Sequence, residues 1–430
     1  MRYINGFMQP FAIIALLLIL GRVVMELWLS RANQSHVCVH ANEVPILLRG
    51  IMDQPTYRRS VDYTLAKNRF GDIVNAFHAV ILIAVLFSGV LPWAFEKFSA
   101  NFGSSVLAMA GFLFLMGIGL SLPGLPFSWY GQFRIEQRFG FNTTSIKTWI
   151  ADRIKGLLLA LLLGCPLLIL VLKLIEWTGA NWWLWAAAVV IAFQLLLLLS
   201  APAIIMPLFN KFTPLPEGEL RQRLFALAQR TDFPTRGIEL MDGSKRSRHS
   251  NAFFTGLGRF RKIVLFDTLV AQLTAPELES VLAHEIGHYK KRHVIKMLGV
   301  SLAGIVMAFA AIAWLARQQW FYRAFGFEHQ PGFAASGSCR MVPAMLLFAL
   351  LAGTITFWVS PLIHIWSRHF EYDADAFAAA TMGETQSLIQ ALRKLSEKNL
   401  SNLTPHPLYS SFYYSHPTLL ERERALQEGA

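Results

Sequence analysis

Charged side chains are scarce in this sequence. Only 15% of the 430 residues are Asp, Glu, Lys or Arg, whereas a soluble domain usually carries about 25%. Apolar residues make up 54% of the chain, and the mean hydropathy is +0.42. This balance excludes an ordinary soluble protein, and it predicts an integral membrane protein.

Cysteine is also scarce. Cys38, Cys165 and Cys339 are odd in number and have no paired spacing, so the sequence predicts neither a disulfide framework nor a thiolate zinc site. It also lacks internal repeats at solenoid periods and low-complexity tails, which excludes a repeat array.

The apolar residues gather in seven blocks, each long enough to cross a hydrocarbon core of about 30 Å. A buried core helix is the alternative for any one block, but Leu157–Leu174, with only Lys173 charged, argues against it for the set. Arg22 interrupts the first block, which lacks the small-residue cleavage site of a signal peptide. The predicted spans are Phe7–Leu29, Ile73–Phe95, Val106–Tyr130, Gly156–Trp177, Trp182–Leu208, Met297–Ala316 and Val342–Trp366.

Basic residues orient these spans. Most of the 39 Lys and Arg follow the first, third and fifth spans or lie in the C-terminal tail. The positive-inside rule then places the N-terminus outside and the C-terminus in the cytoplasm. Topology and attraction to anionic headgroups of the lipid bilayer account for the net charge of +12, so no nucleic-acid partner is expected. The sequence does not specify an oligomeric state.

The most informative motif is His284-Glu285-Ile286-Gly287-His288. On a helix, two His four positions apart project from one face and can bind one Zn²⁺, with the Glu beside the metal to activate water. Thr274 and Glu277 read as a capping box with Pro276 just inside the helix, which is predicted to run to about Arg292. The simpler alternative is a solvated helix that happens to carry two His.

Two polar stretches lie outside the predicted spans, and both are expected on the cytoplasmic side. In the first, we expect a turn-rich linker, a helix, a strand and a hairpin; these are Lys211–Pro216, Glu217–Thr231, Gly237–Met241, and Asn251–Thr255 with Lys262–Phe266 around a turn at Gly256–Arg259. The second stretch is predicted to be largely helical. The expected organisation is an N-terminal membrane region with five spans (1–209), a cytoplasmic segment with the His284–His288 helix (210–296), spans six and seven (297–366) and a cytoplasmic C-terminal segment (367–430).

The third ligand is expected just after the seventh span. A catalytic zinc needs three protein ligands and one open position. Glu371 and Asp375 are four residues apart and share one helical face. Glu371 can take the metal while Asp375 accepts a proton from a ligating imidazole. Taken alone, the pair fits an ordinary solvated acidic face equally well.

Two further elements fit a catalytic site. His416, in the turn Ser415-His416-Pro417, can stabilise an oxyanion, although a lone His is more often a surface or capping residue. The strand Asn251–Thr255 can hold an extended peptide by backbone hydrogen bonds, although a plain hairpin is its alternative.

Several further short sequence blocks lie before and after the His284–His288 motif. They are Ile135–Asn142, Pro207–Phe212 with Pro214 and Leu215, His249–Phe254, Phe370–Asp375 and Ser415–Pro417. In these blocks the chain resembles the type I CAAX prenyl endopeptidases, seven-span membrane zinc metalloproteases of the gluzincin group. The correspondence runs from about Tyr57 to Arg424, nearly the whole chain.

The resemblance implies an all-α multi-pass membrane protein. Seven transmembrane helices would enclose an intramembrane chamber, closed at its cytoplasmic end by a gluzincin-like domain of helices and a small β-sheet. It implies one zinc ion per chain, held by His284, His288 and Glu371, and a peptide or protein substrate. Glu285 would be the general base and His416 a transition-state contact. The block with His249, Asn251 and Ala252 would contribute the substrate strand.

The loop between Arg317 and Met341 is short, and the chain ends at Ala430 without a retention signal. Both features predict a compact bacterial member in the inner membrane; a eukaryotic one would be expected in the endoplasmic reticulum. Most bacteria do not prenylate their proteins, so the sequence leaves open whether a prenyl group is required.

The leading hypothesis is a zinc endopeptidase that hydrolyses peptide bonds near the C-terminus of CAAX peptides, with or without a prenyl group, or of membrane-associated proteins. The alternative is a membrane-protein quality-control protease without prenyl dependence. A site-2 protease would need an Asp-Gly ligand downstream, and Asp242-Gly243 lies upstream. A transporter with a structural zinc is a further alternative. Ionisable residues inside spans would mark its transport path, and Arg22 and His78 are the main ones in the predicted spans.

Overall fold

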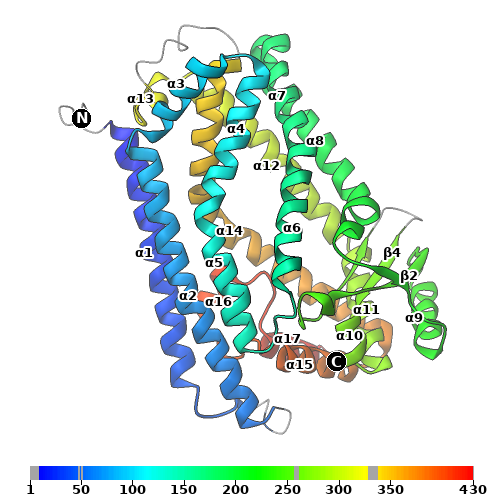
Figure 1. Cartoon of the computed structure of the whole chain (residues 1–430). Helices are drawn as coiled ribbons and strands as arrows, with labels where there is room; N and C mark the ends of the chain where they lie inside the picture. Colours follow the sequence, from blue (N-terminus) through cyan, green and yellow to red (C-terminus); the bar gives the residue numbers. More distant parts are fainter. Residues whose placement is uncertain (1–8, 47–48, 50–51, 256–260, 328–337, 430) are drawn as a thin grey trace.

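The structure is a computed structural model that describes residues 9–46, 49, 52–255, 261–327 and 338–429. Long helices form a bundle, and at its lower right in Figure 1 lies a smaller part of short helices and a sheet. Six helical stretches of the described residues are long and apolar enough to cross a membrane. One of them, Ile146–Leu208, turns at Gly179, whose φ is 56°. Its two arms pack side by side and provide two passes, so the number of passes agrees with the seven predicted.

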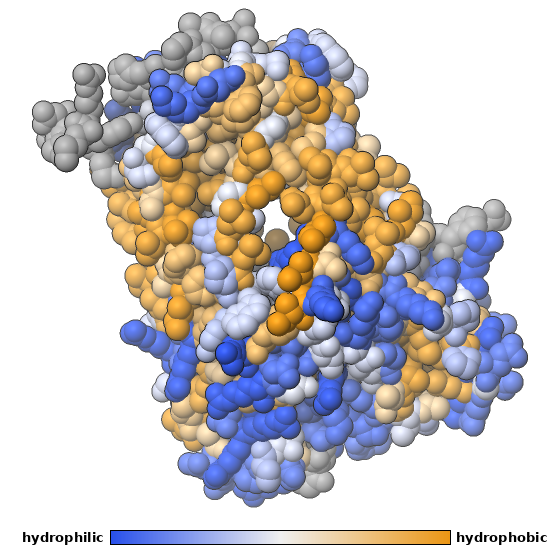
Figure 2. Space-filling view, viewed as in Figure 1, coloured by the Kyte–Doolittle hydropathy of each residue, from blue (hydrophilic) through white to orange (hydrophobic). Residues whose placement is uncertain are grey.

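The bundle contains α1 (Pro10–Val39), α2 (Gln54–Phe87), α3 (Val90–Phe102), α4 (Val106–Ser121), α5 (Leu125–Tyr130), α6 (Ile146–Leu159), α7 (Cys165–Thr178), α8 (Trp182–Ser200), α12 (His293–Leu315), α13 (Gln319–Arg323) and α14 (Ser338–Met382). Apolar side chains cover its surface, whereas polar side chains cover the lower part (Figure 2). An opening hollows the apolar face between the helices. The chain is therefore a multi-pass integral membrane protein with a polar region at one end.

The polar region contains α9 (Glu219–Arg230), α10 (Asp267–Gln272), α11 (Ala275–Lys290), α15 (Gln386–Lys398), α16 (Pro407–Tyr413), α17 (Leu419–Glu428) and the strands β1 (Phe212–Pro214), β2 (Gly237–Met241), β3 (Ala252–Thr255) and β4 (Lys262–Phe266). The strand order is β1-β2-β4-β3, with β2 and β4 parallel and the other pairs antiparallel. The predicted strand and hairpin are confirmed, although the predicted turn at Gly256–Arg259 lies outside the described residues.

Three predicted boundaries are wrong. The predicted span Ile73–Phe95 is interrupted, because Gly89 has a φ of 80° and separates α2 from α3. A glycine in this left-handed conformation ends a helix. Helix α2 also begins at Gln54, well before the predicted start at Ile73. The sequence did not indicate this earlier start because the first half of the helix is polar and carries no hydropathy signal. The predicted linker Lys211–Pro216 contains β1, which forms because β2 offers it a partner edge.

Helix α14 has a consequence for the site. Its 45 residues include both the seventh predicted span and the following acidic segment, which the sequence divided into two elements. Pro343 and Pro361 lie inside this helix. The acidic residues are therefore attached directly to a membrane-spanning helix, without a loop between them.

A second apolar core fixes the position of α11. Leu224 of α9, Ile263 of β4, Ile286 of α11 and Ala378 of α14 are all fully or almost fully buried in it. At Gly287 the helices α11 and α14 touch, since a Cβ atom there would lie 3.0 Å from Ala374 Cα. This close contact brings the faces of α11 and α14 together.

Candidate active site

The helix α11 begins with the predicted capping box. The Thr274 backbone N–H donates to Glu277 Oε2 at 2.7 Å, and Lys394 Nζ lies 2.7 Å from Glu277 Oε1. The helix ends at Lys290, two residues before the predicted end, because Arg292 has a φ of 58° and turns the chain into α12. The motif therefore lies in the last two turns of a well-capped helix.

His284, His288 and Glu371 meet between α11 and α14. The two imidazole Nε2 atoms are 3.1 Å apart. Glu371 Oε2 lies 3.5 Å from His284 Nε2, and Oε1 lies 3.3 Å from His288 Nε2. In a tetrahedral zinc site with bonds of about 2.0–2.1 Å, ligand atoms are about 3.3 Å apart. One donor atom from each residue, all within 4.8 Å of one another, thus surrounds a single point.

A second observation supports the Glu371 carboxylate as a metal ligand. Its Oε2 atom is buried and has no hydrogen-bond partner within the described residues. A buried polar atom without a partner costs free energy unless something else, such as a cation, satisfies it. The His₂Glu donor set is one that catalytic zinc sites use. The residues present therefore fit a divalent metal of the zinc type.

Behind His284 lies a buried charge pair. Asp375 Oδ1 lies 2.8 Å from His284 Nδ1, and Arg422 contacts the same carboxylate through Nε at 2.8 Å and Nη2 at 2.5 Å. Burial alone lowers the pKa of His284, but the nearby carboxylates of Asp375 and Glu371 favour its charged form and raise that pKa to about 9. Because Asp375 binds Nδ1, the Nε2 atom faces Glu371 and is available to a metal.

A different group stands behind His288. Its Nδ1 lies 3.0 Å from Nδ1 of His293, at the start of α12. His293 Nε2 lies 3.5 Å from Asp373 Oδ2, and the ring stacks on Phe370 with centroids 4.1 Å apart. Each metal-facing imidazole is thus held from behind by its own partner.

Sequence reasoning missed Arg422, His293 and Asp373. His293 is five residues beyond His288, which would place it on another face of a continuous helix. The break between α11 and α12 at Arg292 lets its ring lie beside His288. Asp373 was visible inside the Phe370–Asp375 block but had no assigned role. Nothing in the local sequence of α17 indicates that Arg422 is buried.

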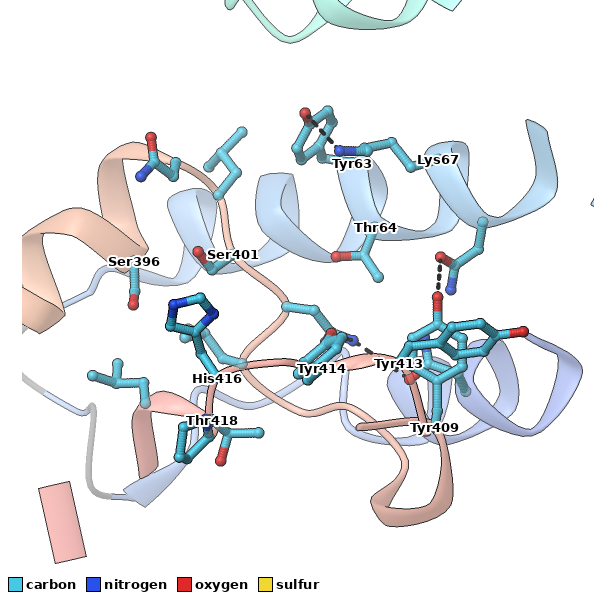
Figure 3. Close-up of a pocket in the computed structure, with 18 of the residues that line it drawn as sticks. Tyr63, Thr64, Lys67, Ser396, Ser401, Tyr409, Tyr413, Tyr414, His416 and Thr418 are labelled. Atoms are coloured by element: carbon cyan, nitrogen blue, oxygen red, sulfur yellow. Dashed lines mark hydrogen bonds between the residues drawn. The ribbon is translucent and has the colours of Figure 1, made fainter. Parts of the chain in front are cut away.

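His416 lies at the edge of the metal site. Its Nε2 is 3.4 Å from Glu371 Oε1, and its Nδ1 is 2.9 Å from the Ser415 hydroxyl. It borders a cavity of about 550 Å³. In Figure 3, Tyr63, Thr64 and Lys67 of α2 form the wall opposite His416. This cavity offers space beside the metal-binding residues.

The predicted substrate strand lies at the edge of the sheet. The strand order leaves one side of β3 without a partner strand among the described residues, while Ala252 pairs with Leu265 on the other side. Asn251, just before β3, is exposed. His249 lines the same cavity as His416 and is fixed by Asn399, 3.1 Å away, and by Phe141, on which it stacks at 4.1 Å.

Comparisons with known proteins cover most of the chain. The family described as "CAAX prenyl protease N-terminal, five membrane helices" matches residues 33–211, and "Peptidase family M48" matches residues 214–430. "CAAX prenyl protease 1" of Saccharomyces cerevisiae is 38% identical over 410 residues, which are 89% of this chain and 88% of that protein. "CAAX prenyl protease 1 homolog" of Homo sapiens is 30% identical over 440 residues, 92% of this chain and 91% of that protein.

A solved structure has the same fold. The crystal structure of S. mikatae Ste24p superposes with a TM-score of 0.88 at 35% sequence identity, and the match covers 97% of this chain and 99% of that one. The chain therefore belongs to the CAAX prenyl protease 1 family within peptidase family M48, and it is a multi-pass integral-membrane metalloendopeptidase.

Proposed function

We propose that this metalloendopeptidase uses one Zn²⁺ ion to hydrolyse a peptide bond near the C-terminus of prenylated CAAX peptides. One observation carries the proposal: two imidazoles from α11 and the carboxylate of Glu371 from α14 converge on a single point. His284, His288 and Glu371 would hold the ion. When bound, zinc lowers the pKa of a coordinated water to about 7 and polarises the scissile carbonyl.

Glu285 is the proposed general base. It follows His284 on α11, and burial raises the pKa of its carboxyl group. A carboxylate with a raised pKa binds a proton more readily near neutral pH, which suits it to take a proton from the attacking water and deliver it to the leaving amine. The charges of His284, His288 and Arg422 act in the opposite direction and favour the ionised carboxylate that a base needs.

His416 is the proposed donor to the developing oxyanion. A Ser415 hydroxyl that donates to His416 Nδ1 leaves the ring hydrogen on Nε2, the atom that lies near Glu371. An N–H on that atom lies at the edge of the metal-binding point, where it would reach the carbonyl oxygen of a bound peptide. Preorganised donors of this kind stabilise the transition state by a few kcal/mol, roughly a hundredfold or more in rate.

The substrate peptide would extend β3. An edge strand binds an extended peptide by main-chain hydrogen bonds, and the block from His249 through Asn251 to Ala252 leads into this edge. The peptide would then lie between the sheet and the cavity that His416 borders. Asn251 is exposed at the start of the strand, where its amide could hold the peptide backbone.

The prenyl requirement rests on the relatives, which are named CAAX prenyl proteases. The alternative is a quality-control protease that needs no prenyl group. We further propose that the N-terminus is outside and the C-terminus cytoplasmic, so that the site faces cytoplasmic substrates. The membrane would be the inner membrane of a bacterium, or the endoplasmic reticulum in a eukaryote.

The test is mass spectrometry of peptide libraries after incubation with the zinc-loaded full chain. Matched prenylated and unprenylated peptides should be cleaved near the C-terminus, the prenylated ones at least tenfold faster. Equal rates would favour the quality-control alternative. Glu285→Gln should retain zinc and lose at least a hundredfold in rate. Glu279→Gln, on the same helix and paired with Arg223, is the control and should retain both zinc and activity.

Retained cleavage in a clean Glu285→Gln preparation would exclude the proposed base. Bound zinc without cleavage of any peptide, together with solute uptake in vesicles, would favour a transporter whose metal is structural.

A further inference from the structure

A second groove shares no lining residue with the cavity beside His416. Its volume is about 650 Å³, and it runs between α2 and the segment 126–139, which comprises most of α5 and the residues that follow it. Ala66, Phe70 and Ile73 line one wall, and their spacing places them on one face of α2. Phe127 and Tyr130 line the opposite wall, and Phe70 stacks on Tyr130 with centroids 5.2 Å apart. The walls of the groove are thus apolar and aromatic.

Three arginines border this apolar groove. Arg69 comes from α2, and Arg134 and Arg138 come from the opposite wall. All three are exposed, and within the described part of the chain no carboxylate oxygen lies within 4.0 Å of any of them. Arg134 lies over the ring of Trp129 at 5.8 Å. The groove therefore combines apolar walls with three positive charges that no acidic side chain neutralises.

The position of the groove along the bundle fits the expected level of lipid headgroups. Arg134 is close to the end of the candidate span Val106–Glu136. In Figure 1, α5 runs down toward the polar region, and in Figure 2 the apolar surface gives way to polar surface at this level. Chain residues 131–136 form a π-helical turn here; such turns are rare and frequently occur at functional sites.

We propose that this groove binds one phospholipid with a net negative headgroup. The three guanidinium groups would bind the headgroup phosphate by paired N–H···O contacts, for which arginine is well suited. An acyl chain would pack along Phe70, Phe127 and Ile73. A zwitterionic lipid also offers a phosphate, but its own cation would be repelled by three uncompensated arginines. Charge complementarity thus selects the anionic lipid.

The groove shares residues with the packing beneath the substrate strand. Ile135 and Phe139 line it, and the same side chains pack with Tyr63 and Phe141. Phe141 in turn stacks on His249. A lipid in the groove would therefore stabilise a cluster that supports the catalytic region, and an anionic lipid should raise the apparent melting temperature of the detergent-solubilised protein.

The test is native mass spectrometry of the full chain in a neutral maltoside detergent. The probes are phosphatidylglycerol and phosphatidylcholine with identical oleoyl chains, at equal concentration. The wild type should retain phosphatidylglycerol at least fivefold better. The triple variant Arg69→Gln, Arg134→Gln, Arg138→Gln should lose that preference. Equal retention of both lipids by the wild type, or a preference that survives in the triple variant, would overturn the proposal.

A charge-matched control separates the groove from the overall charge. Lys147→Gln, Arg230→Gln and Arg424→Gln together remove three exposed charges elsewhere, and this variant should retain the preference. Loss of the preference in the control as well would overturn the proposal, because net charge would then explain it.

A measurement on the wild type tests the proposal without depending on correct folding of the triple variant. Phosphatidylglycerol with a photoactivatable acyl chain should label peptides that contain residues 66–73 or 126–139. Labelling confined to other peptides would overturn the proposal. Excess farnesylated peptide should leave this labelling unchanged; its displacement of the lipid would assign the groove to substrate instead.

Discussion

Arg422 and Asp375 form a two-point ion pair directly behind His284. The guanidinium contacts both carboxylate oxygens of Asp375, at 2.8 and 2.5 Å, and one of those oxygens lies 2.8 Å from His284 Nδ1. All three side chains are buried. The pair joins α17 to α14 and fixes the imidazole orientation that presents Nε2 to the metal-binding point.

The first prediction concerns this pair. In Arg422→Lys, a single ammonium group replaces the planar fork and cannot make both contacts. The Asp375 carboxylate would then hold His284 less rigidly, and we expect zinc affinity to fall about 10- to 100-fold. Titration of the metal-free protein against a competing chelator measures this. Arg424→Lys, an exposed position on the same helix, should change affinity less than twofold; equal losses in both variants would contradict the role of Arg422.

The second prediction concerns the partner of His288. His293→Phe keeps a ring that can stack on Phe370 but removes the nitrogen atom 3.0 Å from His288 Nδ1. We expect a roughly tenfold loss of zinc affinity, with near-normal folding by circular dichroism. The matched control is His369→Phe, since His369 is mostly exposed on α14. Unchanged zinc affinity in His293→Phe would show that His293 only packs.

The third prediction concerns the contact between α11 and α14. In Gly287→Ala the new methyl group would lie 3.0 Å from Ala374 Cα and 3.1 Å from its carbonyl oxygen. Backbone cannot rotate away as a side chain can, so the helices must separate. We expect a cost of about 1–3 kcal/mol in stability, seen as a lower apparent melting temperature in detergent, together with weaker zinc binding.

The control for this contact is Gly299→Ala in α12. A methyl group there meets no atom within 4 Å among the described residues, so the better helix propensity of alanine should leave stability unchanged or raise it by up to about 1 kcal/mol. If both variants behave alike, crowding at Gly287 is not what limits this site.

The sequence predicts the local parts of this site well and the distant parts poorly. The capping box at Thr274 and the spacing of the two His depend on neighbouring residues, so pattern alone defines them. From the sequence alone, the acidic pair Glu371 and Asp375 fits a solvated face as well as a metal site. Only the packing of α14 on α11 distinguishes the two interpretations. The sequence pattern cannot predict that Arg422 is buried, because an arginine on a short amphipathic helix normally faces water.

The membrane spans show the same division. Hydropathy detects the apolar half of α2 and misses its polar half, because lipid exposure, not helix formation, produces the signal. Likewise, the sequence divided α14 where its apolar character ends, although the backbone continues as one helix. Chain reversals at Gly89 and Arg292 depend on backbone conformation, which composition does not reveal.

The last prediction concerns the pH dependence of metal binding. In the metal-free protein, the carboxylates of Asp375 and Glu371 beside His284 overcome the effect of burial and raise its pKa to about 9. At neutral pH this imidazole therefore carries a proton that a metal ion must displace, because only the neutral ring can coordinate. As pH rises toward 9, less of the protein is protonated at His284 and less free energy is spent on removing that proton.

Apparent zinc affinity should therefore rise with pH, about tenfold from pH 7 to pH 8 for one displaced proton. Chelator competition at each pH measures the affinity, and calorimetry in buffers of different ionisation enthalpy counts the released protons. Asp375→Asn removes one carboxylate that raises the pKa of His284, so its affinity should be weaker but less dependent on pH over this interval. An equally steep dependence in Asp375→Asn would mean that the displaced proton is not on His284.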